Sequence, residues 1–141
     1  MGTWGTGPFD NDNAADWAGD VADADAAARP AMIRDALAAV AHAEGYVNSE
    51  EAEIALAAGA LVAAAQSNGP QLGSYGPSAT ALEGVVLDDG VRALAVLAVT
   101  RVLGASSEWR ELWEEAGELG AAREALVPLL SRLGAPADGV S

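Results

Sequence analysis

The residues with the clearest chemical potential are aspartates near the N-terminus. Five carboxylates lie two to four residues apart within the first 23 positions, namely Asp10, Asp12, Asp16, Asp20 and Asp23. Aspartates four residues apart share one helix face, where each like-charge pair costs about 0.2–0.5 kcal/mol. Such a stripe could be a solvated face, a docking face for a basic protein or a cation site. We expect a solvated face and take Asp12, Asp16, Asp20 and Asp23 as the candidate interaction surface.

Specific metal binding and catalysis have little support in the sequence. The run DNDNAAD lacks the loop glycine and closing glutamate of an EF-hand. His42 is the single histidine and there is no cysteine, so a multi-histidine or thiolate metal site cannot form. The run AQSNG at 65–69 partly matches a nucleophile elbow but ends a predicted helix, whereas that motif needs a strand before it. We therefore predict no cofactor, no metal and no catalytic residue.

The first twelve residues, MGTWGTGPFDND, combine three glycines with two large aromatic side chains. Their glycine spacing does not match a dinucleotide-binding loop, and no strand precedes them. Gly2 and Thr6 fit a myristoylation pattern, but the charge that follows is acidic rather than basic. We predict an ordered arm in which glycines allow tight turns and aromatic side chains fill the helical core. Its structural residues would be Trp4, Gly5, Gly7, Phe9 and Asn11, with Trp17 as the anchor on the first helix.

Composition indicates one soluble, acidic domain. The chain has 141 residues, 51% of them hydrophobic, and alanine is the commonest residue. The net charge is −14, with −9 of it in the first 70 residues. This charge argues against nucleic acid and anionic membranes as partners, since both bind basic surfaces, and favours either simple solubility or a basic protein partner. No signal peptide or membrane-spanning run is visible, so we expect a cytoplasmic protein.

The pattern of apolar residues predicts an all-α fold, a compact antiparallel bundle of five or six helices. β-Branched and aromatic residues do not form the alternating runs that are typical of strands, so the sequence does not support a sheet. We expect a single helical domain over 1–134, with the arm at 1–12 and a tail at 135–141. Helices are expected near 13–28, 30–44, 49–66, 89–103, 107–116 and 121–133, with a surface loop at 67–87.

Several local features refine this prediction. Asn13 or Asp12 should cap the first helix, Asn48 with Glu51 or else Ser49 the third, and Ser106 or Ser107 the fifth. The run VRALAVLAVTRVLG is the most apolar around its circumference, so we expect it to be the central helix. Pro128 should kink or divide the last helix.

Two tryptophans on the fifth predicted helix are a further candidate for ligand contact. Trp109, Leu112, Trp113 and Ala116 hold strict helical spacing, which is typical of a core-facing stripe. The tryptophans could instead stack on a ligand in a pocket beside the N-terminal arm. We favour the core role and keep the pocket as the alternative.

Two segments, MGTWGTGPFDNDNAADWAGD and SSEWRELWEEAG, resemble the bacterial domain-of-unknown-function family numbered 4259. The matching residues are Trp4, Gly5, Gly7, Phe9, Asn11, Asp12, Asp16, Trp17, Ser107, Leu112, Trp113 and Glu114. Trp109 stands where the resemblance leads us to expect an aliphatic residue. The resemblance implies a small helical protein and supplies no reaction, cofactor or partner.

The function we expect is that of a small acidic, non-enzymatic protein-interaction domain. An unknown protein, with a basic protein favoured, would be the partner, and a neighbouring gene for a basic toxin would indicate an immunity role. The alternative is a small-molecule-binding or enzymatic helical domain with a pocket near the arm and the Trp109/Trp113 helix.

The arm gives the first testable prediction. Trp4→Ala should cost about 3–5 kcal/mol of unfolding free energy if the indole is buried in the helical core. Thermal and denaturant unfolding followed by circular dichroism measures this cost. Unchanged stability would show that the arm lies on the surface and would make it a candidate binding element.

Overall fold

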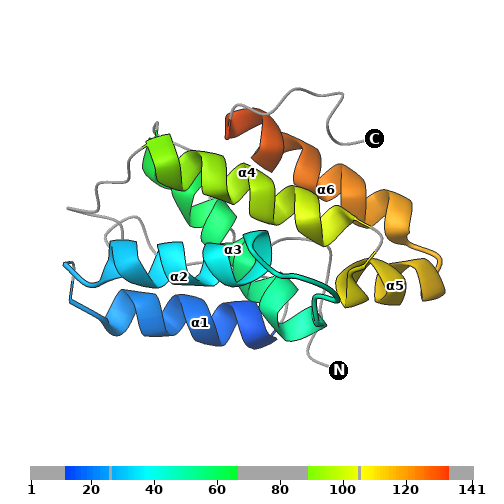
Figure 1. Cartoon of the computed structure of the whole chain (residues 1–141), viewed down its shortest axis with the longest axis horizontal. Coiled ribbons are helices and arrows are strands. Elements are labelled where there is room, and N and C mark those ends of the chain that lie inside the picture. Colours follow the sequence, from blue (N-terminus) through cyan, green and yellow to red (C-terminus); the bar gives the residue numbers. More distant parts are fainter. Residues whose placement is uncertain (1–11, 26, 67–88, 105, 134–141) are drawn as a thin grey trace.

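Six helices make up the ordered framework in a computed structural model that describes residues 12–25, 27–66, 89–104 and 106–133. They are α1 (Asp12–Asp23), α2 (Arg29–Ala41), α3 (Ser49–Gln66), α4 (Asp89–Leu103), α5 (Glu108–Glu115) and α6 (Leu119–Arg132). Within these ranges the single β-type pairing is an isolated bridge between Val47 and Ser107. The helices pack on one another as a compact all-α bundle (Figure 1), as the sequence predicts.

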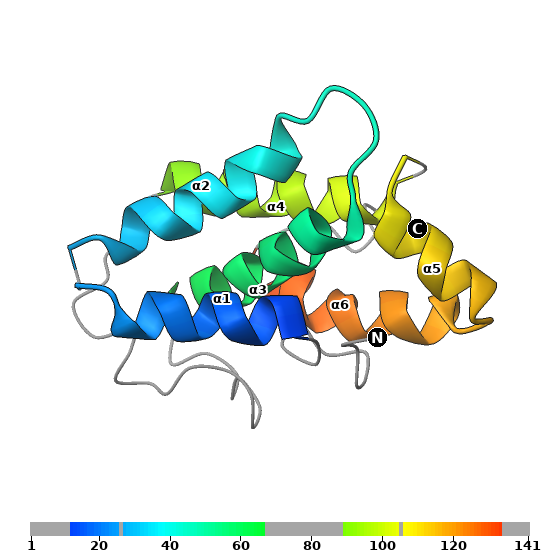
Figure 2. The ribbon, with the colours of Figure 1, turned by 90° about the horizontal axis from the view of Figure 1, so that it is seen from below.

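The centre of the bundle is α3. Its 18 residues include eight alanines and one glycine, so neighbouring backbones can approach it closely. Residues 55–63 are all buried, and α3 contacts each of the other five helices. Figure 2 shows α3 running between α1 and α2, with α4 and α6 on its other side. A helix buried around its whole circumference is a core element.

Our expectation that the run VRALAVLAVTRVLG forms the central helix was therefore wrong. That run forms most of α4, which buries Val91, Ala95, Ala98, Val99 and Val102 but leaves Leu97 58% exposed. α3 is also the more apolar of the two helices on average, because α4 carries Arg92, Thr100 and Arg101. The small side chains of α3 let neighbouring backbones approach it closely.

Short connections and side-chain caps set most helix ends. Arg29 donates from Nε to the Val21 carbonyl and from Nη2 to the Ala22 carbonyl, both at 2.9 Å. These bonds satisfy carbonyls of the last turn of α1, which ends at Asp23, earlier than the predicted residue 28. Pro30 occupies the first turn of α2, as predicted.

The predicted cap of α3 is confirmed. The Asn48 side chain accepts from the Glu51 backbone N–H and donates to the Glu51 carboxylate, each at 2.8 Å, a reciprocal capping pair. Ser107 caps α5 by accepting from the Arg110 backbone N–H at 3.4 Å. α1 begins at Asp12, so Asn13 lies inside the helix rather than capping it, and its amide donates to Glu53 instead.

Two connections meet at one end of the bundle. The Val47 N–H donates to the Ser106 carbonyl and the Glu108 N–H donates to the Val47 carbonyl, both at 2.9 Å. The Ser49 N–H donates to Oε1 of Glu108 at 2.7 Å. The segment between α2 and α3 is thereby attached to the start of α5, which fixes where α3 begins.

Other expectations need correction or lie outside the described residues. α2 ends at Ala41, before the expected end at residue 44, and Tyr46 in the connection that follows is 56% exposed. α6 runs from Leu119 to Arg132 as one helix, so Pro128 does not divide it. The arm residues Trp4, Gly5, Gly7, Phe9 and Asn11, the 67–87 loop and the 135–141 tail fall outside the ranges that the structure describes.

Two helix glycines should respond oppositely to substitution. A Cβ at Gly19, on the exposed face of α1, would meet nothing within 4 Å, whereas one at Gly59 would lie 3.3 Å from Cγ2 of buried Val99. Gly19→Ala should raise the unfolding free energy by about 0.5–1 kcal/mol through helix propensity. Gly59→Val should lower it by about 1–3 kcal/mol through overpacking. Urea unfolding of both variants checks the pair, and equal effects would contradict the placement of α3 against α4.

Candidate functional site

The acidic stripe lies on the outer side of α1. Asp16, Asp20 and Asp23 are exposed, while the buried side of the helix carries Ala14, Ala18 and Val21. Asp12 is the first residue of α1, and its side chain is outside the described set, as is Asp10. At 100° per residue, Asp20 is the described member of the stripe nearest to Trp17, which sits one turn earlier. The remaining aspartates of the stripe point further from the core.

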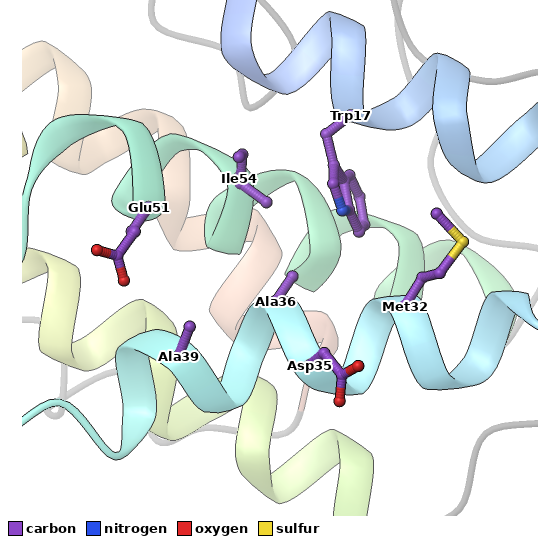
Figure 3. A pocket seen from close by; sticks show the side chains of 7 residues that line it. All are labelled: Trp17, Met32, Asp35, Ala36, Ala39, Glu51 and Ile54. Atoms are coloured by element: carbon purple, nitrogen blue, oxygen red, sulfur yellow. The ribbon is translucent and has the colours of Figure 1, made fainter.

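An open, mostly apolar groove lies beside this stripe, between α1, α2 and α3. It has a volume of about 330 Å³ and is lined by Trp17 of α1, Met32, Asp35, Ala36 and Ala39 of α2, and Glu51 and Ile54 of α3. Figure 3 shows Trp17 and Met32 together at one end, Ala39 and Glu51 at the other, and Ala36 and Ile54 between them. We call it the α1–α3 groove. Its lining can bind apolar side chains or rings, since Trp17, Met32 and Ile54 are only partly buried.

The charge around the α1–α3 groove is negative. The lining residues that the structure describes include two carboxylates, Asp35 and Glu51, both on exposed residues, and no arginine. Two arginines lie on α2: Arg29 bonds carbonyls of α1, and Arg34 does not line the groove. An apolar floor with an acidic rim attracts ligands that carry both apolar and cationic groups.

Hydrogen bonds fix the α3 side of this groove. Asn13 donates from Nδ2 to Oε1 of Glu53 at 2.8 Å, which joins the first turn of α1 to α3. Glu51 is held by its capping pair with Asn48. The rim is thus organised before any ligand binds, so less ordering entropy would oppose binding.

Tyr46 and Glu111 form a second polar contact, at the end of the bundle where the two connections meet. The Tyr46 hydroxyl donates to Oε1 of Glu111 at 2.7 Å on the surface. This hydrogen bond, helped by the nearby carboxylates Glu108 and Glu115, raises the pKa of Tyr46 from 10.0 to about 12. Arg101 donates to the Gly45 carbonyl next to it and to the Ser106 carbonyl. These contacts attach α4 and α5 to the α2–α3 connection.

The tryptophan pair of α5 packs against the core to different extents. Trp109 is only 5% exposed, while Trp113 is partly buried, and their ring centroids lie 6.3 Å apart at 59°. Leu112 is 40% exposed and Ala116 is also exposed, so the predicted four-residue core stripe was wrong at two positions. α5 ends at Glu115, and the residues of its last turn lie mostly outside the core. The groove found here lies against Trp17, and not against the Trp109/Trp113 face on which the alternative pocket depends.

The described part of the chain offers few groups for acid–base or metal chemistry. Its one buried polar side chain is Ser107, whose hydroxyl serves as the α5 cap. Exposed His42 follows α2 directly. Within 12–25, 27–66, 89–104 and 106–133, no three residues among histidine, aspartate and glutamate are grouped closely enough to hold a metal ion.

Sequence reasoning did not identify the groove, although a signal was present. Met32, Ala36 and Ala39 recur at i, i+4 and i+7 on α2, beside the fully buried row of Ile33, Leu37 and Val40. A second apolar row next to the core row widens the apolar face of a helix beyond what one neighbour covers. The wide apolar face of α2 was therefore the sequence feature that could have indicated the groove.

The geometry defines a small all-helical domain with an acidic surface and one apolar groove among its described helices. The chain belongs to the family described as Domain of unknown function (DUF4259), whose model matches residues 2–125. No curated protein and no solved structure shows a match to it. None of the described helices is long and apolar enough to cross a membrane.

The Tyr46–Glu111 contact predicts a pH effect. Because the folded state raises the pKa of Tyr46 from 10.0 to about 12, the contact stabilises the fold fully below pH 10 and loses its effect as the pH rises toward 12. In Glu111→Gln, the pKa of Tyr46 should fall toward 10. Carbon-13 NMR of the tyrosine Cζ nuclei measures the titration, and Tyr46→Phe assigns its signal. An identical titration in Glu111→Gln would contradict the hydrogen bond.

Proposed function

We propose that this protein is a non-enzymatic interaction domain of the cytoplasm that binds a basic protein partner. The observation that carries the proposal is the α1–α3 groove with its acidic rim, next to the exposed aspartates of α1. An open apolar surface is costly in water unless it is small or covered by a partner. Here the surrounding charge favours a covering partner of opposite sign.

The overall charge supports the same partner. The chain carries −14, and −9 of it belongs to residues 1–70, which include α1, α2 and α3. Negative potential on one half of a small domain raises the association rate of a basic partner and lowers that of an acidic one. A toxin with a basic surface is one such partner, and immunity would then be the biological role.

The candidate interaction surface named from the sequence fits this proposal in part. Asp16, Asp20 and Asp23 are accessible on α1, so they can contribute to steering. Exposed charges separated by more than about 10 Å are screened at 0.1 M salt, so the aspartates furthest from the contact should influence rate more than affinity.

Partner capture tests the proposed function. The full chain, immobilised and exposed to a lysate of its source cell, should retain one or a few proteins of high isoelectric point, identified by mass spectrometry. Retention should fall steeply between about 0.1 M and about 0.5 M salt, because exposed charges are screened over that range.

The contribution of the α1 aspartates is tested with the variant Asp16→Asn/Asp20→Asn/Asp23→Asn, which removes three exposed charges and whose fold is checked by circular dichroism. It should capture the same partner more slowly, as measured by surface plasmon resonance with the purified partner. Absence of any retained protein above a bead-only control would overturn the proposal, and so would a partner that is acidic.

A further inference from the structure

We infer that the α1–α3 groove is the docking site for one basic amphipathic helix of the partner. This inference rests on the proposed function and adds to it a location and a partner conformation. Three observations on the groove carry it: its length along α2, the chemistry of its floor and the charge of its rim.

The length suits two turns of helix. Met32, Ala36 and Ala39 line the groove at i, i+4 and i+7 on α2, which corresponds to about 10 Å along the axis. α3 borders the same stretch in the opposite order, with Ile54 beside Ala36 and Glu51 beside Ala39 (Figure 3). Helices that dock in grooves present anchors at the same i, i+3 or i+4, and i+7 positions. A volume of about 330 Å³ accommodates such anchors while the partner backbone lies above them.

The floor combines rigid and adaptable apolar groups. Trp17 lies at one end with Met32 beside it, both partly buried (Figure 3). Tryptophan is the residue type most enriched among side chains that dominate binding energy, and methionine adapts its shape to varied partners. Ala36 and Ala39 add little bulk, so a partner helix can approach the α2 backbone closely.

The rim selects the sign of the partner's charge. Asp35 lies along the α2 side and Glu51 at the far end, while Asp20 is one turn from Trp17 on α1. Among the side chains that the structure describes, the groove lining contains no arginine. Arginine or lysine flanking the apolar anchors of the partner would therefore meet carboxylates at both ends. A second copy of this chain is a poor occupant, because it also carries a net charge of −14.

Synthetic peptides test this inference with the full chain. The first peptide has about 16 residues, enough to populate a helix, with leucines on one face and arginines elsewhere. The second has the same composition in a scrambled order that lacks an apolar face. The third replaces every arginine with glutamate. Fluorescence anisotropy should show that the first binds at least tenfold more tightly than the second, because anchors and charges then act together. The third should not bind.

Variants with matched controls locate the contact. Ala39→Arg places a cation in the groove on an exposed residue and should weaken binding at least tenfold, whereas Ala31→Arg, the same change on an exposed residue of α2 outside the groove, should change it less than about twofold. The double variant Asp35→Asn/Glu51→Gln removes the two carboxylates of the groove rim. It should weaken peptide binding by about threefold or more and reduce the salt dependence of that binding. Glutamine at 51 can keep the capping pair with Asn48. Asp16→Asn/Asp23→Asn removes the same charge outside the groove and should have less effect. Circular dichroism confirms the fold of each variant.

Each contrary outcome overturns the inference in a distinguishable way. Equal binding of the first two peptides, with loss in Asp16→Asn/Asp23→Asn, would indicate charge attraction to α1 alone. A dimer in sedimentation equilibrium that Ala39→Arg dissociates would make a second copy the occupant. If the peptide binds only to the Trp4→Ala variant, the N-terminal arm competes with it and is itself the occupant of the groove. A cellular partner whose affinity is unchanged by Ala39→Arg would leave the proposed function intact and place its contact elsewhere.

Discussion

The rest of the structure depends on the close packing that the alanines of α3 allow. Every other helix contacts α3, and residues 55–63 are buried on all sides. Large side chains on α3 would push neighbouring axes outward, since interhelical distance follows the side chains at the contact. Alanine also loses no side-chain entropy on folding, so an alanine-rich helix can be central although each residue buries little area. Gly59, with Val99 and Leu129 beside it, marks the tightest part of this packing.

The same packing produces the groove. α1 and α2 pack more extensively on α3 than on each other, and Figure 2 shows them diverging from their short connection. The groove lies between these two diverging helices and α3, and it extends from Trp17 and Met32 at one end to Ala39 and Glu51 at the other (Figure 3). The bridge of Val47 with the α4–α5 connection holds the other end, since it fixes where α3 starts and therefore where Glu51 stands. Fold and groove thus share one cause.

Residue pattern and capping chemistry predicted the helices well, because both are local. The buried row of Ile33, Leu37 and Val40, the Asn48–Glu51 pair and the Ser107 cap all follow from spacing along one helix. The central helix was misjudged because the prediction gave large apolar side chains more weight than alanines. α3 is more apolar on average than α4, and its small residues let more backbones converge. The groove was missed for a related reason, since its seven lining residues come from three helices and become neighbours only through the bundle. The hydrogen bond of Tyr46 likewise goes to Glu111, 65 residues away, so the residues around Tyr46 do not reveal it.

Charge and apolar surface on this domain have to be considered together. An acidic surface alone keeps a protein soluble, and an apolar groove alone is compatible with any apolar ligand. Where both occur within two turns of helix, the set of favourable ligands becomes smaller, because each must place cations beside apolar groups at helical spacing. Small cationic molecules satisfy the charge but leave most of the groove uncovered, since it is open rather than enclosing. A basic amphipathic helix satisfies both conditions along the whole length from Trp17 to Glu51, which is why a protein partner explains this surface better than a metabolite does.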